Sequence, residues 1–451
     1  MEIYKIPKPD LSQVDNNKIL KIIFETHNER GGLFELISGT MTPDYLYWDK
    51  VKHILIPKGL TREEFWSAVK FIRKAQSQIT PIISDIKKPF TWIKLPELEK
   101  FLHNVDLNMG GNLFMFSADI DEKSRYRFIS RGIMEEAIAS SQLEGANTTR
   151  QAAKKLLLEG RKPKGHSEIM IVNNHEAMQA IENDYKEKDI SLTGIYELHS
   201  MLTKDILPVA EQGIFRKDED KIVVDDKIRG YIYHEAPKIY FVEEQMKELI
   251  KFANDQKSEP FVHPIIKATM IHFWIGYLHP FTDGNGRLAR LLFYWYLLKN
   301  NYWAFSYLPI SKIIKKSVVA YGQAYLYSEQ DDQDMTYFID YLVKKIKYAM
   351  DDFDKFLEEK AKDNAKMNKL TKSTHNFNNR QIQLLQYLSQ KEGETTTTKS
   401  HMTIYRVTKA TAIKDLRNLA KEGYIAPQKS GKFVLYSGTD KIGQLFTKNN
   451  I

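Results

Sequence analysis

Apolar residues recur at spacings of three and four along much of this chain, and the pattern is strongest from about residue 86 to residue 348. That spacing places apolar side chains on one face of a helix, so we expect a mostly helical protein. The pattern is interrupted at residues 213–241, where β-prone runs alternate with Asp, Lys and Gly. We therefore predict a β-hairpin inserted in a helical domain.

The first block, residues 1–85, also shows helical periodicity. Thr61 is followed three residues later by Glu64, which predicts a capping box and a helix that starts there. Nothing in this N-terminal helical region points to catalysis. We expect a core domain over residues 86–348 and a charged, then polar, helix tail and linker over residues 349–378.

The C-terminal part, residues 379–451, begins with an amphipathic helix. In a later segment, Ala412, Leu416 and Leu419 share one helical face, and two short β-prone runs follow. Helices followed by a β-hairpin resemble a winged helix-turn-helix domain with its recognition helix at residues 408–420.

Charge is concentrated in the same C-terminal part. The chain has a net charge of +8, and residues 376–451 carry 12 Lys and Arg against 5 Asp and Glu, a net +7. Lys409, Lys414 and Arg417 project away from the apolar face, so they are candidate DNA contacts. Winged helices also bind proteins, and the sequence leaves both kinds of partner open.

Composition excludes several classes of protein. The chain has no cysteine, which excludes disulfides and thiolate-built metal sites and fits a reducing cytoplasm. The N-terminus has an early acid and no apolar run of the secretory type. Apolar windows such as residues 291–298 are too short to span a bilayer. We expect a cytoplasmic protein with no membrane partner.

The segment His279-Pro-Phe-Thr-Asp-Gly-Asn-Gly-Arg-Leu-Ala-Arg290 lies between two apolar helices. Gly284 and Gly286 permit the positive φ and close approach that an anion-cradling loop needs. The N-terminus of the following helix favours negative charge. The loop is not a Walker A sequence, because it lacks the Gly-Lys-Ser/Thr ending.

The charged residues of this segment suit phosphate chemistry. Arg287 and Arg290 are neighbours on one helical face, and their guanidinium groups suit bidentate contacts with a polyphosphate. Asp283 offers a hard oxygen ligand for Mg²⁺. His279 is the nearby side chain that can accept a proton near neutral pH.

This segment resembles the signature of the Fic family, His-x-Phe-x-Asp-Gly-Asn-Gly-Arg-x-x-Arg, at every fixed position. The resemblance covers about residues 86–345 and implies a helical Fic core with a β-hairpin flap. It implies transfer of AMP from ATP to a protein hydroxyl, with Mg²⁺ bound. By this resemblance, His279 is the base, Phe281 packs under the loop and Asp283 holds Mg²⁺. The phosphates would be bound by Gly284, Asn285, Gly286, Arg287 and Arg290.

Other assignments stay open. Family members that transfer phosphate depart from Gly-Asn-Gly here, so both glycines favour adenylyl transfer, while other nucleotidyl groups remain possible. Tyr321 is a candidate for the pocket of the nucleotide base. We expect His272 and His263 to be core histidines and His234 to be exposed to solvent. The flap would offer an open edge on which a target segment adds as a strand.

An inhibitory motif of the family, Ser/Thr-x-x-x-Glu-Gly/Asn, is similar to Ser140 to Gly145. The resemblance implies that Glu144 pairs with Arg290 and blocks the site of the γ-phosphate. The same glutamate supports removal of AMP in some relatives, and the sequence leaves that activity open. It also leaves open whether the chain forms a homodimer that hides or exposes Glu144. The rival hypothesis is a DNA-binding regulator whose Fic core senses nucleotide, although a pure sensor needs no base such as His279.

Overall fold

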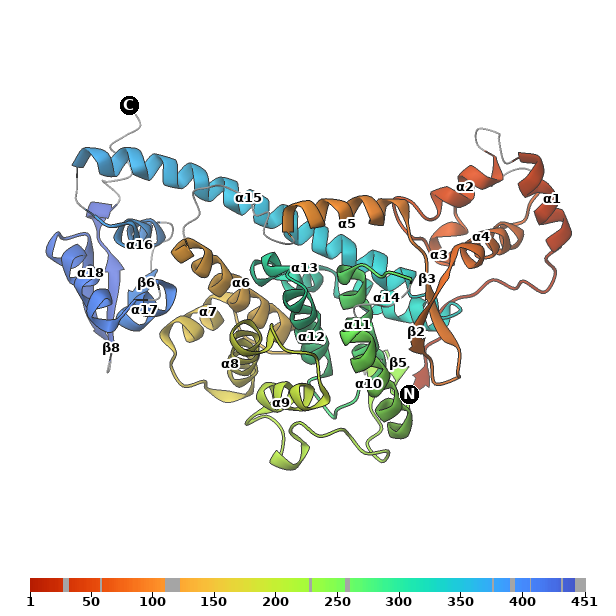
Figure 1. Cartoon of the computed structure of the whole chain (residues 1–451), viewed down its shortest axis with the longest axis horizontal. Coiled ribbons are helices and arrows are strands. Elements are labelled where there is room, and N and C mark those ends of the chain that lie inside the picture. Colours follow the sequence, from red (N-terminus) through yellow and green to blue (C-terminus); the bar gives the residue numbers. More distant parts are fainter. Residues whose placement is uncertain are drawn as a thin grey trace. The chain divides into compact units, whose positions relative to one another are not determined.

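The structure is a computed structural model, and it is mostly helical with small sheets (Figure 1). This confirms the predicted class of fold at that level. The described residues are 1–26, 32–56, 59–109, 122–226, 229–255, 260–374, 377–389, 394–405, 407–430 and 433–442.

The chain divides into two compact units. The first contains residues 1–114, 176–306 and 310–348, and the second contains residues 115–175, 307–309 and 349–451. The segment of residues 279–290 belongs to the first unit, whereas Ser140 and Glu144 belong to the second. The four-part division expected from the sequence stays a prediction.

The first unit is built mainly of helices. They are α1 (Asn16–Thr26), α2 (Leu33–Gly39), α3 (Trp48–Val51), α4 (Arg62–Gln76), α5 (Pro96–Met109), α9 (Leu192–Thr203), α10 (Ile239–Asn254), α11 (Pro264–Leu278), α12 (Asn285–Lys299), α13 (Ile310–Ile314) and α14 (Val318–Gln330). Short turns η1 (Ile181–Tyr185), η2 (Val209–Glu211), η3 (Trp303–Tyr307) and η4 (Lys315–Ser317) lie between them. Two helices, α8 (Gly165–Ala180) and α15 (Thr336–Thr374), contribute residues to both units.

The first unit has two small sheets. Strands β4 (Val223–Asp226) and β5 (Tyr231–Glu235) pair antiparallel, which confirms the predicted hairpin. Strand β1 (Glu2–Ile3) pairs in parallel with the other side of β5. Strands β2 (Gln78–Ile83) and β3 (Pro89–Trp92) form a second hairpin. That hairpin begins inside the N-terminal block, so the block is not purely helical.

The predicted capping box starts α4. The side chain of Thr61 accepts a hydrogen bond from the backbone N–H of Glu64, and the Glu64 carboxylate accepts one from the N–H of Thr61. Both orphan donors at the start of the helix are thus satisfied by residues three apart, as the local sequence predicts.

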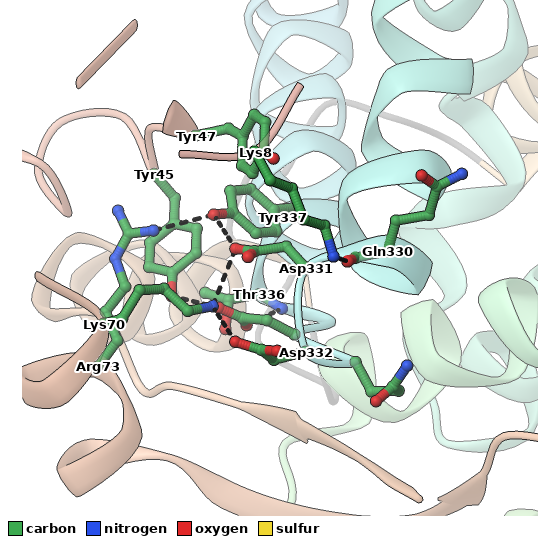
Figure 2. A network of polar contacts seen from close by, with 12 residues as sticks. Lys8, Tyr45, Tyr47, Lys70, Arg73, Gln330, Asp331, Asp332, Thr336 and Tyr337 are labelled. Atoms are coloured by element: carbon green, nitrogen blue, oxygen red, sulfur yellow. Dashed lines mark hydrogen bonds and ion pairs between the residues drawn. The ribbon is translucent and has the colours of Figure 1, made fainter. Parts of the chain in front are cut away.

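A buried polar network ties α4 to the loop between α14 and α15 (Figure 2). Arg73, 2% exposed, donates to the hydroxyl of Tyr337 at 3.0 Å, and that hydroxyl donates to Asp331 at 2.8 Å. The ammonium of Lys70 lies 3.0 Å from both Asp331 and Asp332. Buried charges are tolerated when they are paired in this way, so the N-terminal block is anchored specifically.

The second unit contains α6 (Glu122–Leu143), α7 (Arg150–Glu159), α16 (Asn379–Ser389), β6 (Thr395–Thr397), α17 (Thr398–Tyr405), α18 (Lys409–Lys421), β7 (Ile425–Ser430) and β8 (Phe433–Gly438). The predicted helices and terminal hairpin of residues 379–451 are present, with Ala412, Leu416 and Leu419 fully buried. Strand β6 was not predicted, and it pairs with β8 to make the sheet three-stranded.

Within the second unit, α17 packs against α6 and α7. The hydroxyl of Ser400 donates to the carbonyl of Leu158 at 2.9 Å, and Lys399 donates to the carbonyl of Gly160 at 3.2 Å. Helix α17 therefore contacts both α6, which ends just before Glu144, and the end of α7, which follows it.

Across the residues that the structure describes, no helix combines the length and the apolar character needed to cross a bilayer.

Candidate active site

Two buried helices hold the predicted loop between them. The first, α11, starts at His263, whose Nδ1 accepts the backbone N–H of Ile265 at 3.1 Å, and it ends at His279. The second, α12, starts directly after Gly284. The two helices pack along one another, as their almost continuous apolar sequences require. The loop therefore leaves one rigid helix and enters another.

His279 is the residue that terminates α11. Its backbone adopts a left-handed conformation with φ of 41°, and its Nδ1 hydrogen-bonds the carbonyl oxygen of Gly276. A carbonyl only accepts hydrogen bonds, so Nδ1 carries the hydrogen and the lone pair lies on Nε2. Burial and, as a smaller cause, the charge of His234 lower the pKa of His279 to about 3. The residue as a whole is partly exposed. The ring is thus a neutral base at neutral pH.

Arg216 fixes the backbone on which His279 stands. Its side-chain Nε donates to the carbonyl of His279 at 2.8 Å, and its backbone N–H donates to the carbonyl of Pro280 at 3.0 Å. A further hydrogen bond joins its guanidinium to the carbonyl of Pro237, beyond the hairpin. Arg216 is 5% exposed, so a buried guanidinium links both ends of the hairpin segment to the start of the loop.

The inner side of the loop is closed by Phe281 and Asn285. The Asn285 side chain accepts the backbone N–H of Phe281 at 3.0 Å and donates to its carbonyl at 2.8 Å. The Phe281 ring is fully buried and stacks on His199 of α9, with centroids 3.7 Å apart. Phe281 therefore packs beneath the loop, as the family resemblance implies.

His199 also holds the loop from α9. Its Nδ1 accepts the backbone N–H of Gly213 at 2.9 Å, so its Nε2 carries the hydrogen that is donated to the carbonyl of Asp283 at 2.9 Å. Burial lowers the pKa of His199 to about 4, which agrees with a neutral ring that donates on one side and accepts on the other.

Only one of the two glycines has the predicted backbone conformation. Gly284 has φ of 83°, and a Cβ there would lie 3.2 Å from Thr203 and 3.4 Å from His199. Gly286 instead lies in the first turn of α12 and is not among the described residues with positive φ, so that part of the prediction is wrong. The physical reason is that the helix has already begun at Asn285, and helical φ is negative.

The charged groups gather at the N-terminus of α12. Arg287 is fully buried, donates to the carbonyl of Leu202 at 2.8 Å and lies 3.2 Å from the Asp283 carboxylate. Arg290, one turn further along, is 3% exposed. No side chain in the described residues caps this helix, whose N-terminal end favours anions.

The Asp283 carboxylate fits a magnesium ion that is shared with phosphates. Its side chain is 47% exposed beside the loop, whereas its partner Arg287 is buried. Among the described residues, no group of three or more His, Asp or Glu side chains forms a closed metal site. Mg²⁺ typically binds one or two carboxylates and takes its other ligands from substrate phosphates and water, so a single exposed carboxylate is the expected form.

The remaining predicted residues lie elsewhere. Tyr321 of α14 is partly buried, and its hydroxyl is 2.8 Å from Nε2 of His272, which is 1% exposed among aromatic rings as expected of a core histidine. In the second unit, Ser140 is buried in α6 and Glu144 is exposed in the turn that follows it. On α18, three predicted cations are exposed: Lys409, Lys414 and Arg417.

The sequence did not predict the roles of Arg216 and His199. The expectation that His234 is exposed to solvent is wrong. The His234 side chain is only 10% exposed, because β5 turns it toward α11 and α14 rather than toward solvent. No local signal marks these residues, since each one acts on a segment more than 40 positions away in the chain.

One edge of the hairpin sheet is already occupied. Besides the pairing of β1 with β5, the backbone N–H of Tyr4 donates to the carbonyl of Ile232 at 2.8 Å, and the Tyr4 ring packs against Tyr231 and Tyr233. In the described residues, the sheet order β1-β5-β4 leaves β4 as the outer strand of the hairpin. The open edge expected of the flap is therefore on the β4 side.

Comparison with known proteins shows what the region around this site is similar to. Residues 189–297 match the model of the Fic/DOC family, and residues 279–290 lie within that match.

Curated relatives are distant. The chain is 28% identical over 188 residues to the protein adenylyltransferase Fic of Nematostella vectensis, covering 40% of each chain. It is 26% identical over 219 residues to the protein adenylyltransferase fic-1 of Caenorhabditis elegans, covering 48% of this chain and 39% of that protein. The match thus spans about two fifths of these relatives.

A crystal structure of a Fic family protein from Desulfovibrio desulfuricans G20 aligns with a TM-score of 0.46 and 17% identity. The alignment covers 76% of this chain and 94% of that one.

Proposed function

We propose that this chain transfers AMP from ATP to a serine, threonine or tyrosine hydroxyl of a protein. The observation that carries the proposal is the neutral His279 at the end of α11, with its lone pair on Nε2, beside a complete Fic signature. The signature lies within the residues that match the Fic/DOC family model, and the distant relatives are named protein adenylyltransferases.

His279 acts as the general base in this reaction. As the target oxygen forms its bond to the α-phosphorus, the hydroxyl proton passes to Nε2 of His279. The bond from the α-phosphorus to the bridging oxygen breaks, and pyrophosphate leaves. The backbone of His279 is held by Arg216 at 2.8 Å, so the base keeps its position through the step.

The N-terminus of α12 binds the phosphates. Gly284, Asn285 and Gly286 supply backbone N–H groups, and Arg287 and Arg290 supply guanidinium groups within the first two turns. Asp283 would hold Mg²⁺ against the same phosphates, and the bound ion would neutralise charge that develops on the leaving group. Tyr321 is assigned to the pocket of the nucleotide base.

Glu144 is proposed as a built-in inhibitor of the same site, by pairing with Arg290 where the γ-phosphate would bind. Two features support this: the Ser140-to-Gly145 motif, and the position of Glu144 in the turn that ends α6, next to Gly145 with φ of 91°. A carboxylate at a helix C-terminus is disfavoured by the helix dipole, so a cationic partner for Glu144 is expected.

The decisive experiment is intact-mass measurement after incubation with ATP and Mg²⁺. Glu144→Gly should gain a mass of one AMP unit, on itself or on proteins of an added lysate, and Glu144→Gly with His279→Ala should gain none. A gain of one phosphate unit would mean phosphotransfer. Loss of AMP from a modified target only when Glu144 is intact would mean de-AMPylation. Binding of ATP with no transfer in any variant would favour the nucleotide-sensing regulator.

For the C-terminal segment we propose a winged helix-turn-helix that contacts DNA through α18. The order α16, β6, α17, α18 and the hairpin β7–β8 supports it, as do three exposed cations of α18, Lys409, Lys414 and Arg417. Salt-dependent binding of duplex DNA by the whole chain would support this role. Binding of a protein partner without DNA binding would assign the segment to protein recognition.

A further inference from the structure

His234 lies on the hairpin and belongs to no recognised motif. Its side chain is 10% exposed, in strand β5, and its ring centroid is 5.6 Å from that of His279. A buried titratable group this close to the base of the reaction will affect the protonation of that base, because Coulomb interactions are strong over such distances inside a protein.

Both ring nitrogens of His234 face acceptors. Nδ1 lies 2.7 Å from a carboxylate oxygen of Glu329, at the end of α14, and Nε2 lies 2.8 Å from the carbonyl oxygen of Tyr277. A neutral imidazole has one donor and one acceptor nitrogen, whereas an imidazolium has two donors. Two hydrogen bonds to an ionised carboxylate and a carbonyl therefore require the imidazolium form.

The charged groups around His234 agree with this assignment. Burial by itself lowers the pKa of His234, but Glu329 and, more weakly, Asp85 outweigh it, and the pKa lies above its ordinary value. Asp85, in the turn after β2, accepts the Tyr277 hydroxyl at 3.0 Å. Among the described residues, the rings of Tyr277 and His279 also lie beside His234, and Arg216 contacts the backbone of His279.

The two histidines share the last turn of α11. His279 donates from Nδ1 to the carbonyl of Gly276, and His234 donates from Nε2 to the carbonyl of Tyr277, the next residue. Carbonyl groups in the last turn of a helix lack partners within the helix, and a cation is favourable there. The His234 imidazolium thus completes the helix end from which His279 projects.

We propose that His234, held as an imidazolium by Glu329, is a positioning residue that fixes the helix end beneath His279 and disfavours protonation of His279. The proposal rests on the function proposed above, in which His279 is the base. A base must be unprotonated to act, and the neutral form of His279 is lost as the pH falls. Removal of the neighbouring charge should therefore move that loss to higher pH.

The test uses the full chain labelled at histidine Cε1, with NMR titration of His279 and His234 and no nucleotide present. In His234→Gln, the titration midpoint of His279, about 3 in the parent, should rise by roughly one to two pH units, because a unit charge 5–6 Å away is removed. In Glu329→Gln, the midpoint of His234 should fall. Burial, the larger cause of the His279 shift, remains in both variants.

The second measurement is the pH profile of AMP transfer from pH 4 to 8, in the Glu144→Gly background. Protonation of His279 lies below this range in the parent, so an acid limb due to His279 should approach or enter the range in His234→Gln, as the NMR midpoint rises. His166→Gln is the matched control, because His166 is exposed on α8, and it should leave both readouts unchanged.

An unchanged His279 midpoint in both His234→Gln and Glu329→Gln would overturn the proposal and leave His234 as a structural tie only. If no variant transfers AMP, the proposed function fails, while the NMR titration still decides the relation between the two histidines. If His234→Gln does not fold, as judged by thermal melting, the His279 midpoint in Glu329→Gln decides instead, and it should also rise.

Discussion

The Nε2 atom of His199 lies 2.9 Å from the carbonyl oxygen of Asp283, and the opposite nitrogen of the same ring accepts the N–H of Gly213. One neutral side chain of α9 thus holds the loop between α11 and α12 on one side and the start of the hairpin segment on the other. His199 also stacks on Phe281, so its packing and its hydrogen bonds can be separated by substitution.

His199→Phe keeps an aromatic ring for the stack and removes both hydrogen bonds. Loss of two hydrogen bonds from a buried loop should cost about 1.4–2.7 kcal/mol of loop ordering, which corresponds to about a 10- to 100-fold lower kcat/KM for AMP transfer. Steady-state kinetics in the Glu144→Gly background measure it, with exposed His103→Phe as the control. A variant within twofold of its parent would show that stacking alone holds the loop.

Gly284→Ala tests the one glycine of the loop that needs its conformation. The new Cβ would meet Thr203 at 3.2 Å with φ of 83°, so the loop must shift. We expect the affinity for ATP, measured by calorimetry, to weaken at least about tenfold. The free energy of unfolding should also fall by about 1–2 kcal/mol, because alanine is strained in the left-handed conformation.

Gly423→Ala supplies the control for that change. Its φ is 75°, and its Cβ would have ordinary contact only, 3.9 Å from Lys441 in the C-terminal segment. It should show the stability loss without the loss of ATP binding. Equal ATP affinity in the two variants would contradict the assigned role of Gly284.

Arg73→Met tests the buried network of the N-terminal block. The substitution keeps an unbranched apolar stem and leaves the Tyr337 hydroxyl and the carbonyls of Thr40 and Leu46 without their guanidinium donor. The free energy of unfolding should fall by about 3 kcal/mol, because buried acceptors lose their charged partner. Chemical denaturation measures it, and exposed Lys74→Met on the same helix should change it by less than about 0.5 kcal/mol.

Substitution of Lys409, Lys414 and Arg417 by Gln tests the proposed DNA contact. Each cation that neutralises a phosphate makes log K fall with log salt more steeply, by about 0.9 in the slope. The affinity of the variant should therefore be lower, and its affinity should depend less steeply on salt. Fluorescence anisotropy with duplex DNA over a range of salt measures both. Lys247→Gln with Lys251→Gln, exposed on α10, should change neither. Wild-type affinity in the α18 variant would reject this helix as the DNA contact.

Features with local causes could be predicted from the sequence. The capping box of Thr61 and Glu64, the hairpin over residues 223–235 and the helices on both sides of residues 279–284 follow from turns, caps and periodicity within a few residues. The Fic signature is equally local, because a phosphate loop is built from consecutive backbone groups at a helix N-terminus.

The surroundings of that loop could not be predicted in this way, because they depend on how distant segments pack. His199 meets Asp283 across 84 positions, and His234 meets Glu329 across 95. A histidine in a strand gives no sign of which way it faces until the hairpin is packed, and for that reason His234 was wrongly expected to be exposed. The packed helices bring these distant groups to one end of α11. At that end of α11, burial and the charges of His234 and Arg216 lower the pKa of His279, a property that no stretch of sequence contains.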